Sequence, residues 1–418
     1  MQNSIKLIAV LPRTESDTQR SGWSPGPLPW AVISLIGATC LLFIALSVSH
    51  SHSHSHLIDY HDERLLRWGA NFGPYTLGGQ YWRPFSAVFL HLAIWHLAGN
   101  MLMVFLVGRY LERQVGAANT VALYLLAGAS GYVLSIAYLP SLMSVGASGA
   151  VAGIATAVVV IYAVKRVPGY KRALTWAILT LALLVFAAID SKRADNMAHL
   201  GAAGMGVLFG VLFVTVLRFP SEGWNQRWII ALCTAVLIIA FISLVESRSD
   251  VITFNRGIRL ENSDATAAIA TIREYMRNNP KDIIAHAELG RIYEAQGRYM
   301  ESAAEYHAIL DLIPNDRVAQ YNLGYLDLML NKTNDAVILF SKSVPKLPED
   351  GDRYYYFALS LKLTNALPLA EVMAQQAIWI SPKSSRNHAL FADILADLGK
   401  TKEAQAEREL AAQLEAAK

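Results

Sequence analysis

The sequence predicts an all-α protein with two unlike parts: a polytopic bundle of membrane-spanning helices and an α-solenoid of helix pairs after it. The chain of 418 residues is 54% hydrophobic and 17% charged, whereas a soluble protein carries about a quarter charged residues. The apolar excess lies in residues 30–246, while residues 250–418 have an ordinary polar composition and an internal repeat. The chain therefore contains at least two domains.

Seven apolar runs are long enough, or nearly so, to cross a bilayer, which takes about 20 residues. They lie near residues 30–48, 91–108, 117–139, 145–164, 173–189, 197–217 and 228–245, and the fifth is the shortest. The polar leader before the first run is long for a signal peptide, so cleavage is not expected. The predicted domains are a polar tail (1–29), a six-helix core (30–217), a seventh helix with its flanks (218–248) and a repeat domain (249–418).

Lysine and arginine in the short loops predict the orientation, because cytoplasmic loops carry an excess of them. With the N-terminus inside, eleven such residues lie inside and five outside. The inner ones are Lys6, Arg13, Arg20, Arg109, Arg113, Lys165, Arg166, Lys171, Arg172, Arg218 and Arg227, and the outer ones are Arg64, Arg67, Arg83, Lys192 and Arg193. We expect a multi-pass protein of a bacterial cytoplasmic membrane whose repeats lie on the periplasmic or extracellular side.

The C-terminal part repeats with a period of 34 residues. Prolines recur at this step, and so do small residues in phase with them: Pro280, Pro314, Pro348 and Pro382, and Ser302, Ala336, Ala370 and Ala404. This period with helical texture is typical of tetratricopeptide repeats. The predicted repeats are 283–316, 317–350, 351–384 and 385–418, with a degenerate one at about 249–282. Stacked helix pairs form concave binding surfaces, so a protein partner or a substrate is expected there.

Three polar residues near the starts of the even-numbered spans are the candidates for chemistry. Polar side chains at membrane depth are costly and are functional candidates by default. His96 lies near the start of the second span, Ser148 of the fourth and His199 of the sixth. These spans run in the same direction, so the three side chains are expected at similar depth, a few ångströms below the outer surface at about 1.5 Å per residue.

Small residues predict that the fourth and sixth spans touch, because they let helix backbones approach in membranes. Gly149 and Gly153 are one turn apart on the fourth span. On the sixth span a stripe of small residues continues the face of His199; its members are Ala202, Gly206 and Gly210. Ser148 and His199 are therefore expected within hydrogen-bond reach, as an activated nucleophile requires.

On the second span, His96 and Asn100 are four residues apart and share a face. Both can donate hydrogen bonds to a developing oxyanion. A structural interpretation competes with catalysis, since a serine in a span often only bonds a carbonyl one turn back. The common depth of His96, Ser148 and His199 favours catalysis.

Other chemistries find no support in the sequence. It has no His-Glu-x-x-His for a zinc protease, no pair of aspartates within spans and no lysine in a span near Ser148. The inverted repeats and broken helices of transporters are also missing. Cys40 and Cys233 give no metal-type spacing, and a net charge of +3 does not indicate nucleic-acid binding. No cofactor, metal or nucleic acid is expected, although the alternating Ser-His run at 49–56 leaves loose metal binding open beside a solvated loop.

Together these residues resemble the rhomboid family of intramembrane serine proteases. The matching motifs are Trp82-Arg83, His96-x-x-x-Asn100, Gly146-Ala147-Ser148-Gly149 and Ala198-His199. Their order follows the family pattern over about residues 25–217, and the seventh span is similar to the added helix of the six-plus-one form. Ala152 departs from the pattern, because the family often has an aromatic residue there under the histidine. Ala202 also departs, because the small stripe usually begins with glycine.

The resemblance implies a role for each residue. Ser148 would attack the scissile carbonyl, and His199 would be the general base and then the acid for the leaving amine. His96, Asn100 and the Ser148 amide would form the oxyanion hole, and Trp82-Arg83 would brace a loop in the outer leaflet. The implied function is an intramembrane serine endopeptidase that cleaves transmembrane segments of other proteins within the lipid bilayer. The alternative is a catalytically silent rhomboid-like scaffold or chaperone with a protein-binding repeat domain; such relatives usually lack the serine or the histidine.

Overall fold

The computed structural model describes residues 28–48, 61–167, 169–190, 195–218, 226–347 and 350–417. Within these residues every named element is a helix, which confirms the predicted all-α class. A single isolated bridge, between Asn71 and Ser144, accompanies the described helices. The Ser-His run at 49–56 lies outside the described residues.

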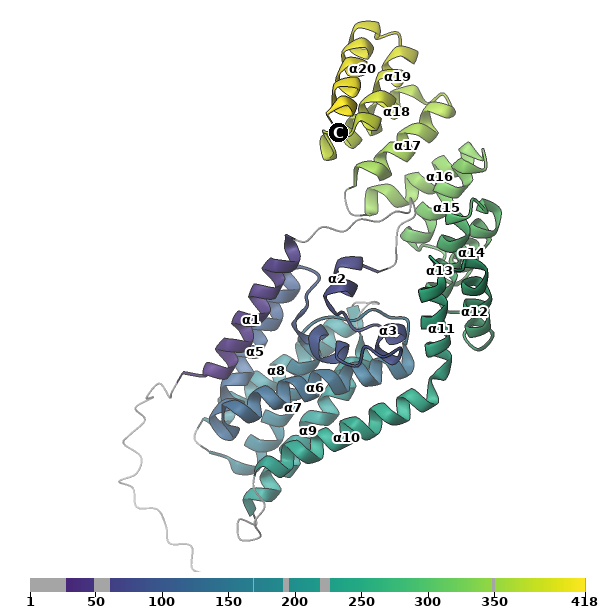
Figure 1. Ribbon diagram of the computed structural model, residues 1–418. Coiled ribbons are helices and arrows are strands. Elements are labelled where there is room, and N and C mark those ends of the chain that lie inside the picture. Colours follow the sequence, from purple (N-terminus) through teal and green to yellow (C-terminus); the bar gives the residue numbers. More distant parts are fainter. Residues whose placement is uncertain are drawn as a thin grey trace, which may run out of the picture.

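Within the described residues, seven long helices form one bundle, called the membrane bundle below (Figure 1). They are α1 (Trp30–Ser47), α5 (Ile94–Val115), α6 (Ala117–Tyr138), α7 (Ser148–Lys165), α8 (Tyr170–Asp190), α9 (Asn196–Arg218) and α10 (Gln226–Ser247), one at each predicted span. Over the described residues, six of them are long and apolar enough to cross a membrane. The exception is α8, predicted as the shortest span, so its crossing stays a prediction.

The two ends of the bundle are fixed by different contacts. At one end, Glu112 of α5 accepts hydrogen bonds from the amides of Ala31 and Val32 in α1, at 3.1 Å each. At the other end, Arg248 follows α10 and donates to the carbonyl oxygen of Ala137 in α6 at 2.9 Å. The helices α7 and α9 both begin at this second end, where the chain also leaves the bundle for the repeats.

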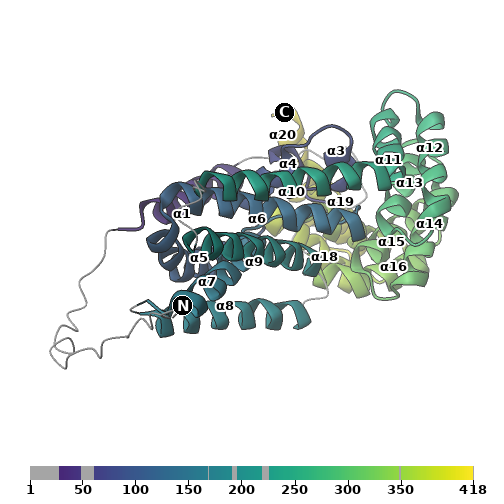
Figure 2. The same cartoon turned by 90° about the horizontal axis from the view of Figure 1, so that it is seen from below.

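In the bundle, α7 packs against α5, α6, α8 and α9. Figure 2 shows α6, α9 and α10 side by side along the bundle. The helix contact between α7 and α9 is the most extensive of the described chain, and it places the N-terminal ends of these two helices next to each other.

Between α1 and α5 the chain forms a cap of short helices. These are α2 (Glu63–Trp68), α3 (Gly73–Leu77), α4 (Arg83–Ser86) and the 3₁₀ helix η2 (Ala87–Phe89). Arg83 is buried and donates to the carbonyl oxygens of Leu66 at 2.8 Å and Ala70 at 2.7 Å. Its guanidinium also lies over the ring of Trp82, 5.2 Å from the centroid. Arg83 thus holds this loop through two backbone carbonyls, while the expected bracing by the pair in the outer leaflet stays a prediction.

Ten further helices form five pairs in the described part of the C-terminal region. The pairs are α11 (Ser249–Leu260) with α12 (Ala265–Asn278), α13 (Ile283–Ala295) with α14 (Tyr299–Leu312), α15 (Arg317–Met329) with α16 (Thr333–Ser343), α17 (Gly351–Leu363) with α18 (Leu367–Ile380), and α19 (Ser385–Asp397) with α20 (Thr401–Ala416). A short 3₁₀ turn, η4 (Val344–Lys346), follows α16. The period of 34 residues seen in the sequence is therefore the period of the helix pairs.

Capping residues and small residues explain this period. The first helices of four pairs begin after a side chain that accepts a backbone amide hydrogen bond, as N-caps do; these caps are Asp282, Asp316, Asp350 and Ser384. Inside a pair, a Cβ on Gly290 would lie 2.7 Å from the ring of Tyr306. Small residues in the first helix therefore let the large ring of the second helix pack against the backbone.

The first repeat helices pack on the cap of the membrane bundle. Phe254 and Tyr275 of the first pair belong to the same buried cluster as Phe72 and Leu77 of the cap. Figure 1 shows α11 beside α3. The repeats are thus attached at the end of the bundle where α7 and α9 begin.

Candidate active site

Ser148 and His199 meet at the N-terminal ends of two neighbouring helices. Ser148 is the first residue of α7, and His199 lies in the first turn of α9. The distance from His199 Nε2 to Ser148 Oγ is 2.9 Å, and both residues are half-buried. When the serine hydroxyl donates to Nε2, the neutral imidazole carries its proton on Nδ1. The pair meets the geometric condition for a nucleophile and its base.

Glycines let the backbones of α7 and α9 come this close. A Cβ on Gly206 would lie 2.0 Å from the carbonyl oxygen of Gly153. One turn later, a Cβ on Gly210 would lie 2.9 Å from Cβ of Val160. This is the contact that the small-residue stripes of the fourth and sixth spans predict.

Gly146 sets the course of the chain into α7. Its φ of 123° lies in a region that L side chains rarely adopt. Its amide donates to the carbonyl oxygen of Ala87 at 2.9 Å, and its own carbonyl accepts from Tyr132 Oη at 2.7 Å. A Cβ on Gly146 would lie 2.8 Å from Cε1 of His96 and 3.8 Å from Nδ2 of Asn100. Only glycine therefore lets the His96 ring lie this close to the backbone before α7.

His96 and Asn100 lie one turn apart on α5, and both approach Gly146. Asn100 is 4% exposed, and its Nδ2 lies 3.1 Å from Nε2 of His91. The amide of Ala147 also points at this ring nitrogen, at 3.5 Å. With His91 Nε2 as the acceptor, the amide group of Asn100 keeps a second N–H for another acceptor.

His91 is a site residue that the sequence left without a role. The second span was predicted to begin at residue 91, but α5 begins at Ile94, because Ala93 has an extended backbone with φ −148° and ψ 154°. His91 therefore lies in the loop, 1% exposed, with its ring 5.0 Å from that of His96. The sequence signal for it was the close spacing of His91, His96 and Asn100 in one short stretch.

Asp195 is the second residue that the sequence did not suggest. It directly precedes α9, and its backbone carbonyl accepts from the amide of His199 at 3.3 Å. Ala152, where the sequence lacks an aromatic residue, is 2% exposed and has no ring to place under the histidine. The first turn of α9 is instead held by Asp195, whose side chain makes further contacts with two other segments.

The fold and this site define a helical membrane protein with a serine and a histidine in contact near one end of its bundle. Residues 78–216 match the family model described as the Rhomboid domain, and this range contains His96, Asn100, Ser148 and His199. The chain therefore contains a Rhomboid domain, the family that its motifs resemble.

Two curated relatives show the extent of the likeness. The chain is 25% identical over 306 residues to Rhomboid protease GluP of Bacillus subtilis (strain 168), covering 71% of this chain and 52% of that protein. It is 36% identical over 154 residues to RHOMBOID-like protein 4 of Arabidopsis thaliana, covering 36% of this chain and 38% of that protein. The chain thus spans about half the length of the first relative and less of the second.

Among solved structures, MamA 41-end from Desulfovibrio magneticus RS-1 is similar to 41% of this chain and 97% of its own length, with a TM-score of 0.39 and 19% sequence identity.

Proposed function

We propose that this chain is an intramembrane serine endopeptidase in which Ser148 is the nucleophile and His199 the general base. The observation that carries the proposal is the 2.9 Å contact between Ser148 Oγ and His199 Nε2, two residues that lie 51 positions apart in the sequence. A serine hydroxyl is a weak nucleophile until an adjacent base takes its proton. This membrane bundle brings such a base to the serine.

The reaction follows from the roles of the two side chains. Ser148 Oγ attacks the scissile carbonyl carbon while its proton passes to His199 Nε2. The imidazolium then gives this proton to the leaving amine nitrogen, the C–N bond breaks and the acyl group stays on Ser148 Oγ. Water next attacks the acyl-enzyme, with His199 again as the base, and the hydroxyl of Ser148 is restored.

Negative charge on the carbonyl oxygen needs donors, and three groups near Ser148 supply them in this proposal. As the first residue of α7, Ser148 has an amide in the turn whose N–H groups lack carbonyl partners within the helix. His96 and Asn100 approach the same region beside Gly146. Each donor of this kind typically contributes about 10²–10³ in rate.

The substrates we propose are transmembrane segments of other membrane proteins. Inside a lipid bilayer the backbone carbonyls of a helix are bonded within the helix, so a scissile bond becomes accessible only where the helix opens. Ser148 and His199 lie at helix ends, near the boundary of the bundle, where such opening costs least. In this proposal residues 30–217 form the catalytic unit, and the repeats of residues 249–418 recruit substrates or a protein partner.

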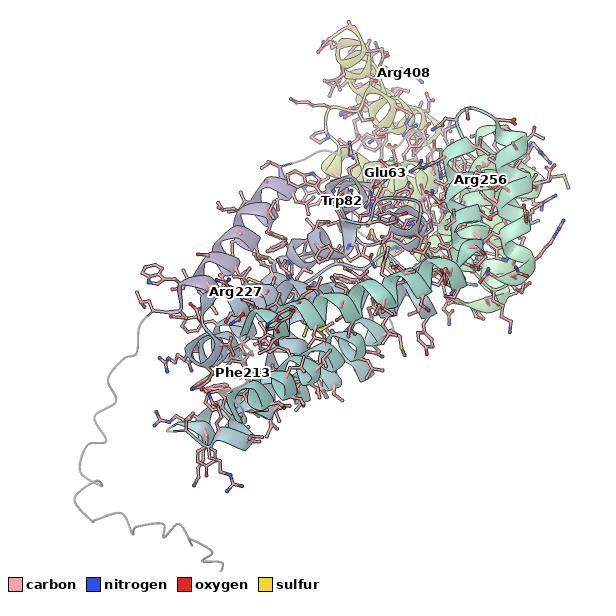
Figure 3. All side chains as sticks on the ribbon, turned by 60° about the horizontal axis from the view of Figure 1, so that its bottom comes forward. Glu63, Trp82, Phe213, Arg227, Arg256 and Arg408 are labelled. Atoms are coloured by element: carbon pink, nitrogen blue, oxygen red, sulfur yellow. The ribbon has the colours of Figure 1, made fainter. Side chains whose placement is uncertain are left out.

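The proposed orientation puts both the repeats and Ser148 on the outer side of a bacterial cytoplasmic membrane. Figure 3 shows Phe213 and Arg227 toward one end of the bundle and Trp82 toward the other. Lys165, with its ammonium 5.2 Å from the Phe213 ring centroid, lies at the end away from Trp82. Basic residues at that end support its placement inside.

The test is cleavage of a single-span model substrate in detergent or liposomes by the purified full chain, with Ser148→Ala as the matched variant. The proposal expects a cut within or at the border of the span, mapped by mass spectrometry, and none with Ser148→Ala. Equal cleavage by both proteins would reject Ser148 as the nucleophile. Substrate capture without cleavage by either protein would favour the scaffold alternative.

A further inference from the structure

The carboxylate of Asp195 joins three separate segments at the candidate site. Its Oδ1 accepts a hydrogen bond from the amide of Ala198 at 2.9 Å, which caps the first turn of α9. Its Oδ2 accepts from Ser135 Oγ at 2.5 Å and from Ser144 Oγ at 2.6 Å. One side chain thus binds the helix that carries His199, the end of α6 and the loop that leads to Ser148.

Both serine partners are held firmly themselves. Ser135 is 1% exposed and Ser144 is 5% exposed. The backbone of Ser144 pairs with Asn71 in both directions, at 2.8 and 3.0 Å, so the loop is fixed to the cap as well. Four residues after Ser144 the chain reaches Ser148, and four residues after Asp195 it reaches His199.

We infer that Asp195 is a positioning residue, which sets the distance and orientation between Ser148 and His199 by tying their two supporting segments to one carboxylate. The inference rests on the proposed function, because it concerns the geometry of that catalytic pair. Asp195 acts through its neighbours and does not itself touch the substrate.

The physical reason lies in how steeply reaction rates depend on geometry. A displacement of about 1 Å between reacting groups costs up to about 10²-fold in rate. Side-chain hydroxyls aimed at one carboxylate make charge-assisted bonds, which are about twice as strong as neutral ones. Glycines in the α7–α9 contact bring the helices together, and Asp195 fixes how the helix ends lie relative to each other.

The Asp195→Ser variant distinguishes a positioning role of Asp195 from a role in helix capping alone. Serine is a good N-cap for the amide of Ala198, but its short side chain cannot reach Ser135 and Ser144 as well. We expect Asp195→Ser and Asp195→Ala to lower kcat by about 10- to 100-fold, with KM changed less than about threefold. Ser144→Ala removes one hydroxyl only and should lower kcat by about 2- to 10-fold, the factor that one net hydrogen bond corresponds to.

The measurement is kcat and KM of the purified full chain on the single-span substrate, with the folded fraction of each variant taken from its thermal unfolding transition. A fall in kcat per folded molecule in Asp195→Ser and in Ser144→Ala supports positioning. Wild-type kcat in folded Asp195→Ser would overturn it, because capping would then be the whole role. If Asp195→Ser does not fold, unchanged kcat in folded Ser144→Ala and Ser135→Ala overturns it equally. A wild type that fails to cleave, like Ser148→Ala, overturns the proposed function itself.

Discussion

Gly206 of α9 packs against the backbone of Gly153 of α7 so closely that a Cβ on Gly206 would lie 2.0 Å from the Gly153 carbonyl oxygen. The same Cβ would lie 2.2 Å from Oγ1 of Thr156. No side chain fits there unless the two helices move apart. The distance between Ser148 and His199, at the ends of these helices, therefore depends on a glycine two turns away.

Gly206→Ala is expected to weaken both stability and activity. Overpacking of a tight contact costs about 1–3 kcal/mol, and separation of the helices moves His199 away from Ser148. Gly204→Ala is the matched control on the same helix, because a Cβ there would meet nothing within 4 Å. Thermal unfolding and cleavage rates of the two variants give the comparison; similar rates in both would show that the backbone contact does not control the pair.

Gly146→Ala is expected to abolish most of the cleavage activity. Alanine would be destabilised here for two reasons: the backbone strain of a φ of 123°, and a steric clash of its Cβ, 2.8 Å from His96 Cε1. Gly79→Ala is the matched control: it has the same backbone strain, since its φ is 112°, but its Cβ would meet nothing within 4 Å. The backbone strain alone is about 1–2 kcal/mol, so Gly79→Ala should lower stability and keep kcat. If Gly79→Ala lowered kcat as much as Gly146→Ala, the loss would come from impaired folding and not from the contact with His96.

Ser148→Ala, His199→Ala and the double variant should all have the same residual activity. The two side chains act as one unit, so the first substitution removes nearly everything that the pair supplies. The measurement is single-turnover cleavage under enzyme excess, which detects slow reactions. A double variant much slower than either single one would mean that the serine and the histidine act independently.

Removal of the repeats should have an effect that depends on where the chain is cut. Helices α11 to α13 share the buried cluster of the cap, including Phe72 and Leu77. Deletion of residues 317–418 leaves these helices in place and should spare cleavage of a bare transmembrane peptide, while cleavage of a client with an outer domain falls. Tethering can raise the local client concentration to about the mM range.

Deletion of residues 249–418 should, in contrast, destabilise the membrane bundle as well, because it exposes the apolar face of α3. Thermal unfolding of the two truncated proteins beside the full chain checks this prediction. Equal stability of both truncations would show that the contact between α11 and the cap contributes nothing.

The first repeats should lose stability as the pH rises. His286 Nδ1 lies 2.7 Å from Glu305 Oε2, and its Nε2 lies 3.3 Å from the carbonyl oxygen of Pro280. Burial by itself would lower the pKa of His286, but the hydrogen bonds and the charge of Glu305 outweigh it, and the pKa is raised above 6.5. The stabilisation is therefore full below the unfolded pKa of about 6.5 and is lost as pH rises through the folded pKa.

His286→Gln is the matched variant, because Gln320 holds the same place in the next repeat and donates to the Pro314 carbonyl at 3.2 Å. Thermal midpoints between about pH 5 and pH 9 should fall with rising pH more in the wild type than in this variant. Parallel curves would rule out His286 as the titrating group.

The regular parts of this fold were predictable because they repeat. Apolar runs marked all seven long helices, and the step of 34 residues marked the helix pairs. The approach of α7 and α9 also followed from Gly153 and Gly206, since small residues recur once per turn on each helix. Helix periodicity even placed His96 and Asn100 on one face.

The irregular parts were not predictable in this way. The cap from α2 to η2 has no period, and its course depends on single contacts such as those of Arg83 with Leu66 and Ala70. His91 and Asp195 lie in loops beside helix starts, where no spacing rule says which way a side chain turns. His91 contacts Asn100, and Asp195 contacts Ser135 and Ser144. These partners come within reach only in the folded protein.

The most direct test of the catalytic pair is covalent labelling with a fluorophosphonate, which reacts with an activated serine hydroxyl and needs no knowledge of the natural substrate. The full chain in detergent is treated with the reagent, and the adduct is located by peptide mass spectrometry over time. We predict a single adduct on Ser148 in the wild type and a labelling rate lower by orders of magnitude in His199→Ala. An adduct on another residue, or an equal rate of Ser148 labelling in His199→Ala, would contradict the claim that His199 activates Ser148.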